Sequence, residues 1–364
     1  MSDFGRFFLP GPTEVRPKIL KAMLQPMIGH RTEQFAAMHR QIVQGLQMVF
    51  RTHRPVYVAS SSATGLMEMA IRGCPEGPIL SLVNGSFAER FARIAQVCGR
   101  RTRVLTVPWG DTHPLEMVEQ HLAAESFVAM TVVQSETSTG ALADVRALTE
   151  LAHRYGVMCL VDSVTGVAAL PVETEAWGLD FVLTASQKSL ALPPGLAFAV
   201  ASEAYILQAA SVPDRGRYFD PVEYEEAGLD DGTPTTPALP LLYAAQAQLA
   251  DIAKEGIETR WARHGMMLAE VETFVDAQRD RGRALTFLAR PGERSPSVSC
   301  LALPGELSAK AVVSGMSERG YTIARGYGQR KDSTIRIGHM GDHTVAGLRG
   351  CLAALDETLG ALTA

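Results

Sequence analysis

Short apolar runs alternate with amphipathic helical patterns over most of this chain. The expected strands cover residues 56–59, 79–83, 104–107, 128–133, 158–162, 181–185 and 196–201. The helical patterns between them include 65–72, 87–97, 114–123 and 145–155. This alternation predicts an α/β fold, in which helices sandwich a mostly parallel, seven-stranded sheet.

The last third of the chain has a different pattern. One long helix is expected over 240–276, and strands follow it at 297–303, 321–324 and 334–337. We therefore expect a large domain over residues 1–255 and a smaller C-terminal α+β domain over 256–364. Residues 211–236, where proline, glycine and aspartate collect, are expected to form an ordered excursion loop.

Two of the expected strands lead directly to a charged residue. Asp162 ends the run Val157-Met158-Cys159-Leu160-Val161, and Lys188 closely follows Phe181-Val182-Leu183-Thr184-Ala185. A lysine placed at the end of a buried strand loses solvent and becomes a nucleophilic amine, as a Schiff-base lysine requires. An aspartate beside it can keep the ring nitrogen of pyridoxal 5′-phosphate protonated, so that the ring accepts electrons. The pair predicts that cofactor.

A phosphate site is expected at the turn between the first strand and the helix that follows. Ser62, Ala63 and Thr64 stand there, and small or hydroxyl side chains let an anion approach the amides of a helix N-terminus. A simple N-cap role for Ser62 or Thr64 fits this pattern equally well. No GxGxxG motif follows the first strands, which disfavours a dinucleotide cofactor.

Composition narrows the class of protein. The chain has 364 residues, of which 46% are hydrophobic and 20% are charged, as in ordinary globular proteins with a sizeable core. Its net charge of -5 argues against nucleic acid or an anionic membrane as a partner, and no apolar run is long enough to span a bilayer. The first residues lack the layout of a signal peptide. Five widely spaced cysteines without a CxxC pair predict a cytoplasmic protein without disulfides or a metal site.

Several motifs resemble those of the class V aminotransferases, in the fold type I pyridoxal-phosphate superfamily. The resemblance extends from Phe8-Leu9-Pro10-Gly11-Pro12-Thr13 to Ile335-Arg336-Ile337-Gly338-His339-Met340-Gly341, so it covers nearly the whole chain. Its most family-specific pieces are Glu136-Thr137-Ser138-Thr139-Gly140 and Ser186-Gln187-Lys188. Within the class, the chain is most similar to the alanine–glyoxylate and serine–glyoxylate (or pyruvate) branch.

The resemblance implies catalytic and substrate-binding roles for four residues. Lys188 would form the Schiff base with the cofactor and move the proton at the substrate α-carbon, while Asp162 would pair with the pyridinium nitrogen. Arg336 would bind the substrate α-carboxylate through two parallel hydrogen bonds. Gly11 would leave room for a small amino acid at the substrate mouth, in the N-terminal segment 1–15.

The resemblance also implies how the phosphate is held. Residues 62–64 and Gln187 would bind it within one subunit. Thr236 would reach the phosphate site of the neighbouring subunit, which implies a homodimer with shared active sites. The family's companion tyrosine, three residues before this threonine, is Thr233 here, so the phosphate anchor is expected to be weaker or rearranged.

Two further residues would contact the cofactor ring. Phe87 stands where the family stacks an aromatic side chain on the pyridine ring, and a plain core position would also suit it. Thr137 would contact the phenolic oxygen or the substrate, although a hydroxyl in this loop also fits an ST-turn.

These roles imply a ping-pong aminotransferase that moves an amino group from alanine or serine to glyoxylate or pyruvate. The sequence shows no second arginine placed for a side-chain carboxylate, which favours small, uncharged donors. Another donor on the same scaffold, such as 2-aminoethylphosphonate or pyridoxamine, stays open. A lyase of the cysteine desulfurase type is disfavoured, because Cys300 and Cys351 lie in an expected strand and helix rather than in a mobile loop.

Overall fold

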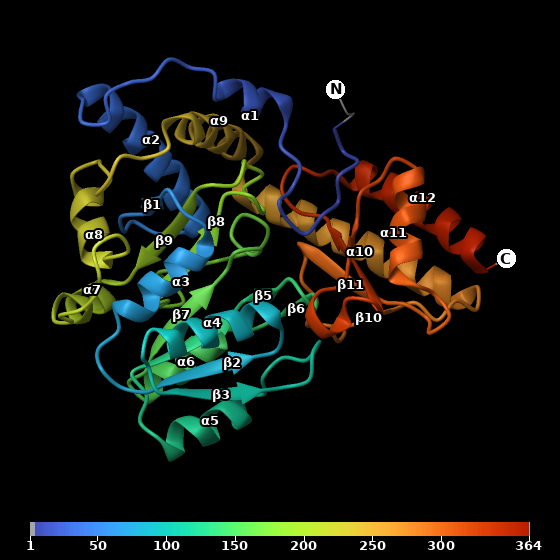
Figure 1. Ribbon diagram of the computed structural model, residues 1–364, viewed down its shortest axis with the longest axis horizontal. Helices are drawn as coiled ribbons and strands as arrows, with labels where there is room; N and C mark the ends of the chain where they lie inside the picture. Colours follow the sequence, from blue (N-terminus) through green and yellow to red (C-terminus); the bar gives the residue numbers. More distant parts are fainter. Residues whose placement is uncertain (1–3, 364) are drawn as a thin grey trace.

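A seven-stranded sheet forms the centre of the large domain in this computed structural model, which describes residues 4–363 (Figure 1). The strand order is β1-β9-β8-β7-β4-β2-β3. Strands β8, β7, β4, β2 and β3 run parallel, whereas β9 is antiparallel to both of its neighbours. The predicted α/β fold with a mostly parallel, seven-stranded sheet is confirmed. The strands span β1 (Tyr57–Ala59), β2 (Ile79–Val83), β3 (Thr102–Thr106), β4 (Ala129–Val133), β7 (Met158–Asp162), β8 (Phe181–Ala185) and β9 (Ala197–Ala201).

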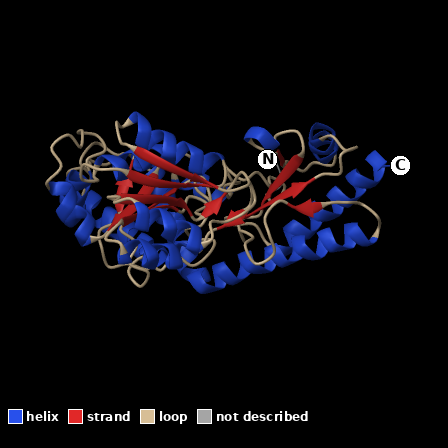
Figure 2. Ribbon diagram, turned by 90° about the horizontal axis from the view of Figure 1, so that it is seen from below, coloured by secondary structure: helices blue, strands red, loops and turns tan. Residues whose placement is uncertain are grey.

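Helices cover both faces of this sheet (Figure 2), so its central strands are buried along their whole length and are mostly apolar. Strand β7 shows why. Cys159 and Val161 pack into the core formed with α2, α6 and α9, whereas Met158 and Leu160 pack into the opposite core with α3 and α4. The covering helices are α1 (Pro17–Ala22), α2 (Glu33–Phe50), α3 (Ala63–Arg72), α4 (Ser86–Val97), α5 (Leu115–Ala124), α6 (Val145–Arg154), α7 (Glu203–Ala210), α8 (Pro221–Leu229) and α9 (Leu239–Glu255).

A second, four-stranded antiparallel sheet lies in the C-terminal part, with the strand order β10-β11-β13-β12. Apolar residues of α10, α11 and α12 share a core with this sheet, and Phe8 from the N-terminal segment joins that core. The elements are α10 (Ile257–Asp280), β10 (Thr286–Phe287), β11 (Val298–Ala302), α11 (Ala309–Glu318), β12 (Ala324–Arg325), β13 (Thr334–Gly338) and α12 (Val345–Thr363). A short hairpin of β5 (Ser135–Glu136) and β6 (Ala141–Leu142) completes the strands.

The structure corrects three expectations. The single helix expected over 240–276 is two helices, because Gly256 takes a non-helical backbone with φ of 81° between α9 and α10. The excursion loop expected over 211–236 contains α8, whose N-cap Asp220 accepts a hydrogen bond from Val222 N at 3.0 Å. The strand expected at 321–324 is reduced to β12. The domain boundary at residues 255 and 256 stays a prediction.

Among residues 4–363, no helix combines the length and the apolar character that a membrane span needs.

Candidate active site

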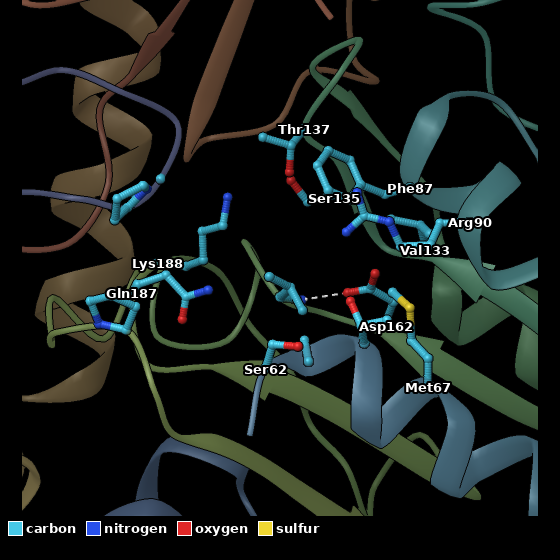
Figure 3. A pocket seen from close by; sticks show the side chains of 16 residues that line it. Ser62, Met67, Phe87, Arg90, Val133, Ser135, Thr137, Asp162, Gln187 and Lys188 are labelled. Atoms are coloured by element: carbon cyan, nitrogen blue, oxygen red, sulfur yellow. Dashed lines mark hydrogen bonds between the residues drawn. The ribbon is translucent and has the colours of Figure 1, made fainter. Parts of the chain in front are cut away.

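A cavity of about 400 Å³ lies at one edge of the large sheet (Figure 3). Strands β1, β4, β7 and β8 all run in the same direction, so their carboxyl ends meet at this edge. Parallel α/β sheets place ligands at such an edge. Residues that follow these strands, the start of α4 and the N-terminal segment supply the walls. The lining includes Gly11, Ser62, Ala63, Thr64, Phe87, Thr137, Asp162, Gln187 and Lys188, all of which the sequence had singled out.

Lys188 points into this cavity from the turn after β8 (Figure 3). Its Nζ donates a hydrogen bond to the carbonyl of Pro10 at 2.5 Å. Removal from water and the nearby Arg336 guanidinium lower the pKa of Lys188 to about 8, against the opposing effect of Asp162. A substantial fraction of this amine is therefore neutral near pH 8, as a nucleophile or a base requires.

Asp162 lies at the end of β7 and is 2% exposed. Its Oδ1 accepts a hydrogen bond from Val164 N at 2.8 Å. Burial raises the pKa of this carboxyl to about 7, and Lys188 and Arg90 only partly oppose that shift. Among residues 4–363, no cationic side chain forms an ion pair with Asp162. A protonated ring nitrogen is the kind of partner that such a carboxylate lacks.

The turn after β1 presents hydroxyls and helix amides to the cavity. Ser62 is the N-cap residue of α3, but its side chain makes no capping hydrogen bond. Ala63 and Thr64 form the first turn of this helix, whose free amides favour an anion. Gly65 keeps the turn tight, because a Cβ there would lie 2.4 Å from the Phe219 ring and the Ser61 hydroxyl. The turn therefore fits a phosphate group.

Glu136 is a buried carboxylate beside the site whose contacts the sequence did not indicate, although it lies inside a motif that had been recognised. The side chain is fully buried. One carboxylate oxygen accepts hydrogen bonds from Phe87 N at 3.1 Å and Ala88 N at 3.0 Å, at the start of α4. The other accepts from Ser138 N at 3.0 Å and Ser138 Oγ at 2.6 Å. Glu136 thus fastens the helix that carries Phe87 to the loop that carries Thr137.

Arg336 lies in the middle of β13, in the second sheet, and is beside the cavity rather than among the residues that line it. Its Nε donates to the carbonyl of Arg325 at 3.1 Å, and its Nη1 to the carbonyl of Thr137 at 3.4 Å. The residue is 8% exposed, and burial lowers the pKa of its guanidinium. No carboxylate within residues 4–363 forms an ion pair with it. The structure thus places a buried cation beside Thr137 and close enough to Lys188 to shift its pKa.

Gly11 lies against the lysine itself. Its φ is +109°, and a Cβ there would lie 2.4 Å from Lys188 Nζ. Glycine at this position leaves space for the Lys188 side chain. Whether the same space serves a small substrate stays a prediction.

Two of the singled-out residues lie away from the cavity of their own chain. Thr236 is exposed, and its Oγ1 lies 3.3 Å from Nε2 of His30. Thr233 is buried, and its hydroxyl donates to the carbonyl of Thr235 at 2.8 Å. Neither contact includes a cavity residue.

The cavity also contains an arginine that sequence reasoning missed. Arg90 lines the wall beside Asp162, and its guanidinium carbon lies 4.8 Å from the Phe87 ring centroid (Figure 3). It makes no ion pair within the described part of the chain. The expectation that no second arginine is placed for a side-chain carboxylate stays a prediction, since the structure shows only that Arg90 lines the cavity wall. Arg90 follows Phe87 by one turn of α4, so helical periodicity could have indicated it.

Comparisons with known proteins show which family this chain belongs to. Residues 21–325 match the family model described as aminotransferase class-V. The chain is 31% identical over 358 residues to an L-aspartate–glyoxylate aminotransferase of Paracoccus denitrificans, a match that covers 95% of this chain and 89% of that one. It is 30% identical to an alanine–glyoxylate aminotransferase of Felis catus, with 96% and 86% of the two chains covered. A crystal structure of an alanine–glyoxylate aminotransferase from Nostoc sp. superposes with a TM-score of 0.90 at 27% identity and covers 99% of this chain and 96% of that one.

Proposed function

The chain belongs to the class V aminotransferases, and on that basis we propose that it uses pyridoxal 5′-phosphate to move an amino group from a small L-amino acid to glyoxylate or pyruvate. Alanine and serine are the proposed donors, and the two half-reactions follow a ping-pong order. One observation carries the proposal. A lysine with a lowered pKa and a buried, unpaired aspartate face the same cavity, beside an arginine that has no acidic partner.

The residues of the cavity suit this cofactor. The α3 amides at residues 62–64 and the Gln187 side chain would hold the phosphate, and Phe87 would stack on the ring. Asp162 would hold a proton against the ring nitrogen, and Thr137 would face the phenolic oxygen or the substrate. When bound, the cofactor supplies an aldehyde that joins the Lys188 amine in a Schiff base, and a ring that accepts electrons.

The chemistry of the substrate falls to two side chains. Arg336 would bind the α-carboxylate through two parallel hydrogen bonds and so orient the α-carbon. Lys188 would take the α-proton from the substrate on its Nζ and pass it to the C4′ carbon of the cofactor. Its lowered pKa would let it both accept and donate this proton near neutral pH. The Pro10 carbonyl is positioned to orient the lysine amine.

We also propose a homodimer in which Thr236 completes the phosphate site of the partner subunit. Thr236 is exposed and does not line its own chain's cavity, as such a role requires.

The cysteines within residues 4–363 are all unpaired, which supports a cytoplasmic location.

An acidic donor such as aspartate is a second candidate, and Arg90 is the observation that favours it. An unpaired guanidinium in the cavity wall could receive a second carboxylate. Donors such as 2-aminoethylphosphonate or pyridoxamine have no specific contact in their favour. The lyase alternative gains no support either, because Cys300 and Cys351 are buried in β11 and α12 and burial raises the pKa of both thiols.

The test is the visible absorption spectrum of the purified protein. We expect a yellow band that disappears with L-alanine or L-serine and returns with glyoxylate, and a Lys188→Ala variant that shows no turnover. A band that responds to L-aspartate alone would favour the acidic donor. If no band forms after pyridoxal 5′-phosphate is added, the proposed cofactor and the role of Lys188 are both wrong.

A further inference from the structure

Tyr327 lies next to the cavity, although it belongs to the second sheet's side of the molecule. It sits in the turn between β12 and β13, and its ring stacks on the Phe87 ring, with centroids 5.7 Å apart and an angle of 24° between the planes. Phe87 lines the cavity from the large domain. The stack therefore joins the two parts of the chain at the cavity wall.

The backbone of this turn fixes where the ring stands. Gly328 has a φ of +53°, and a Cβ there would lie 2.8 Å from the Ser86 hydroxyl and from the Trp109 ring. Inside the turn, Thr334 Oγ1 donates to the carbonyl of Arg330 at 2.9 Å. The turn therefore lies close against Ser86 and Trp109, where a Cβ at Gly328 would collide, and this contact positions the backbone that carries Tyr327.

The same ring lies beside Arg336. The guanidinium carbon of Arg336 is 5.4 Å from the Tyr327 ring centroid, within the range of a cation–π contact. Lys188 Nζ is 5.9 Å from the Phe87 centroid. A carboxylate on Arg336, held by hydrogen bonds of about 2.8 Å, places its α-carbon only one bond further from the guanidinium than the carboxyl carbon. A side chain on that α-carbon would then lie near the Phe87 and Tyr327 rings, which stand beside Lys188 and Arg336.

We propose that Tyr327 is a specificity-determining residue: its ring walls the pocket for the substrate side chain and limits donors to side chains of one or two heavy atoms beyond the α-carbon. This inference rests on the proposed function, since it takes Arg336 as the carboxylate site. The ring also holds the Arg336 guanidinium in place, so its removal affects binding of the carboxylate as well as selection of the side chain.

The test uses holoenzyme and two 2-hydroxy acids that have no amino group to transfer. L-Lactate has the carbon skeleton of alanine, and L-2-hydroxy-4-methylpentanoate has that of leucine. Calorimetric titration should show at least tenfold tighter binding of lactate by the unchanged protein. Tyr327→Ala should weaken lactate severalfold and tighten the larger acid, so that the preference falls below threefold. Tyr327→Phe keeps the ring and should keep the preference.

A second variant separates this role from damage to the fold. Gly328→Val leaves Tyr327 in the sequence but pushes the turn off Ser86 and Trp109, so it should shift the preference in the same direction as Tyr327→Ala. Thermal unfolding and the yellow band confirm that each variant is folded and loaded. A preference unchanged within twofold in Tyr327→Ala and Gly328→Val overturns the inference and leaves the proposed function standing. If the unchanged, loaded protein binds neither hydroxy acid, the carboxylate role of Arg336 fails, and the proposed function fails with it.

Discussion

Replacing Glu136 by glutamine tests whether this buried carboxylate holds the two halves of the cofactor site together. A carboxylate offers two acceptor oxygens, and here each receives two donors. A glutamine amide has one oxygen, so its NH2 group must face either the α4 amides or the Ser138 pair. The second arrangement costs less, because the Ser138 hydroxyl can turn and accept, but it leaves the buried Ser138 N–H without an acceptor.

The magnitude follows from that arrangement. One unsatisfied buried N–H costs about 1–3 kcal/mol, and the bonds to Phe87 N and Ala88 N each lose part of their charge-assisted strength. We therefore expect Glu136→Gln to lower the free energy of unfolding by roughly 2–4 kcal/mol. Ser138→Ala removes one hydroxyl donor and keeps the charge, so it should cost about 1 kcal/mol.

Urea denaturation of the cofactor-free protein at pH 5.5 and pH 8 checks both values. Burial raises the pKa of Glu136. Ionisation of this carboxyl therefore lowers the free energy of unfolding as the pH rises through that raised value. Glutamine does not titrate, and the difference between the two proteins should therefore shrink at pH 8. A loss below about 0.5 kcal/mol in Glu136→Gln would refute the reasoning, because it lies under the roughly 1–3 kcal/mol expected for an unsatisfied buried group. A loss in Ser138→Ala as large as that in Glu136→Gln would also refute it.

Two more predictions concern residues that face Lys188. In the cofactor-free protein, burial raises the pKa of Asp162 from 3.8 to about 7, so its contribution to stability is fully present below pH 3.8 and is lost as the pH rises through about 7. This loss of stability is on the order of 4 kcal/mol. Asp162→Asn should remove the pH dependence, since asparagine does not titrate. Urea denaturation between pH 5 and 8 checks this, and a free energy of unfolding that falls as steeply with pH in the variant contradicts it. Gly11→Ala should destabilise the protein by about 1–3 kcal/mol because its φ is +109°. Its Cβ would also displace Lys188 Nζ and weaken the yellow band, and a variant with unchanged stability and an unchanged band counts against both effects.

Much of the large domain could be predicted because its local signals agree. Strands covered on both faces are mostly apolar, as β4, β7 and β8 are. Asp144 caps α6 by accepting a hydrogen bond from Ala147 N at 3.0 Å. The break at Gly256 was missed because apolar residues continue on both sides of it. Helix α8 was missed because the prolines and glycines around it dominate the pattern, although Asp220-Pro221 is itself a start signal for a helix.

Some residues of the candidate site could likewise be predicted from local sequence signals, and others could not. Asp162 and Lys188 could be placed because each follows a strand, and the ends of neighbouring parallel strands must meet. Glu136, by contrast, has its main partners at the start of α4, in a segment far away in the sequence. A buried carboxylate that satisfies helix amides has the same one-letter code as an exposed one, so only the fold reveals its partners.

Arg336 shows where a motif stops being informative. Its family motif favours an arginine that binds a carboxylate, although an arginine in a strand can also form an interdomain ion pair. The structure shows no ion pair of Arg336 with a carboxylate within residues 4–363; its contacts are the backbone carbonyls of Arg325 and Thr137 and the Tyr327 ring. Thr137 lies beside the large sheet, whereas Arg325 and Tyr327 lie on the side of the second sheet. A buried guanidinium satisfied only by neutral groups keeps its charge available, and that availability makes it suited to bind an anion.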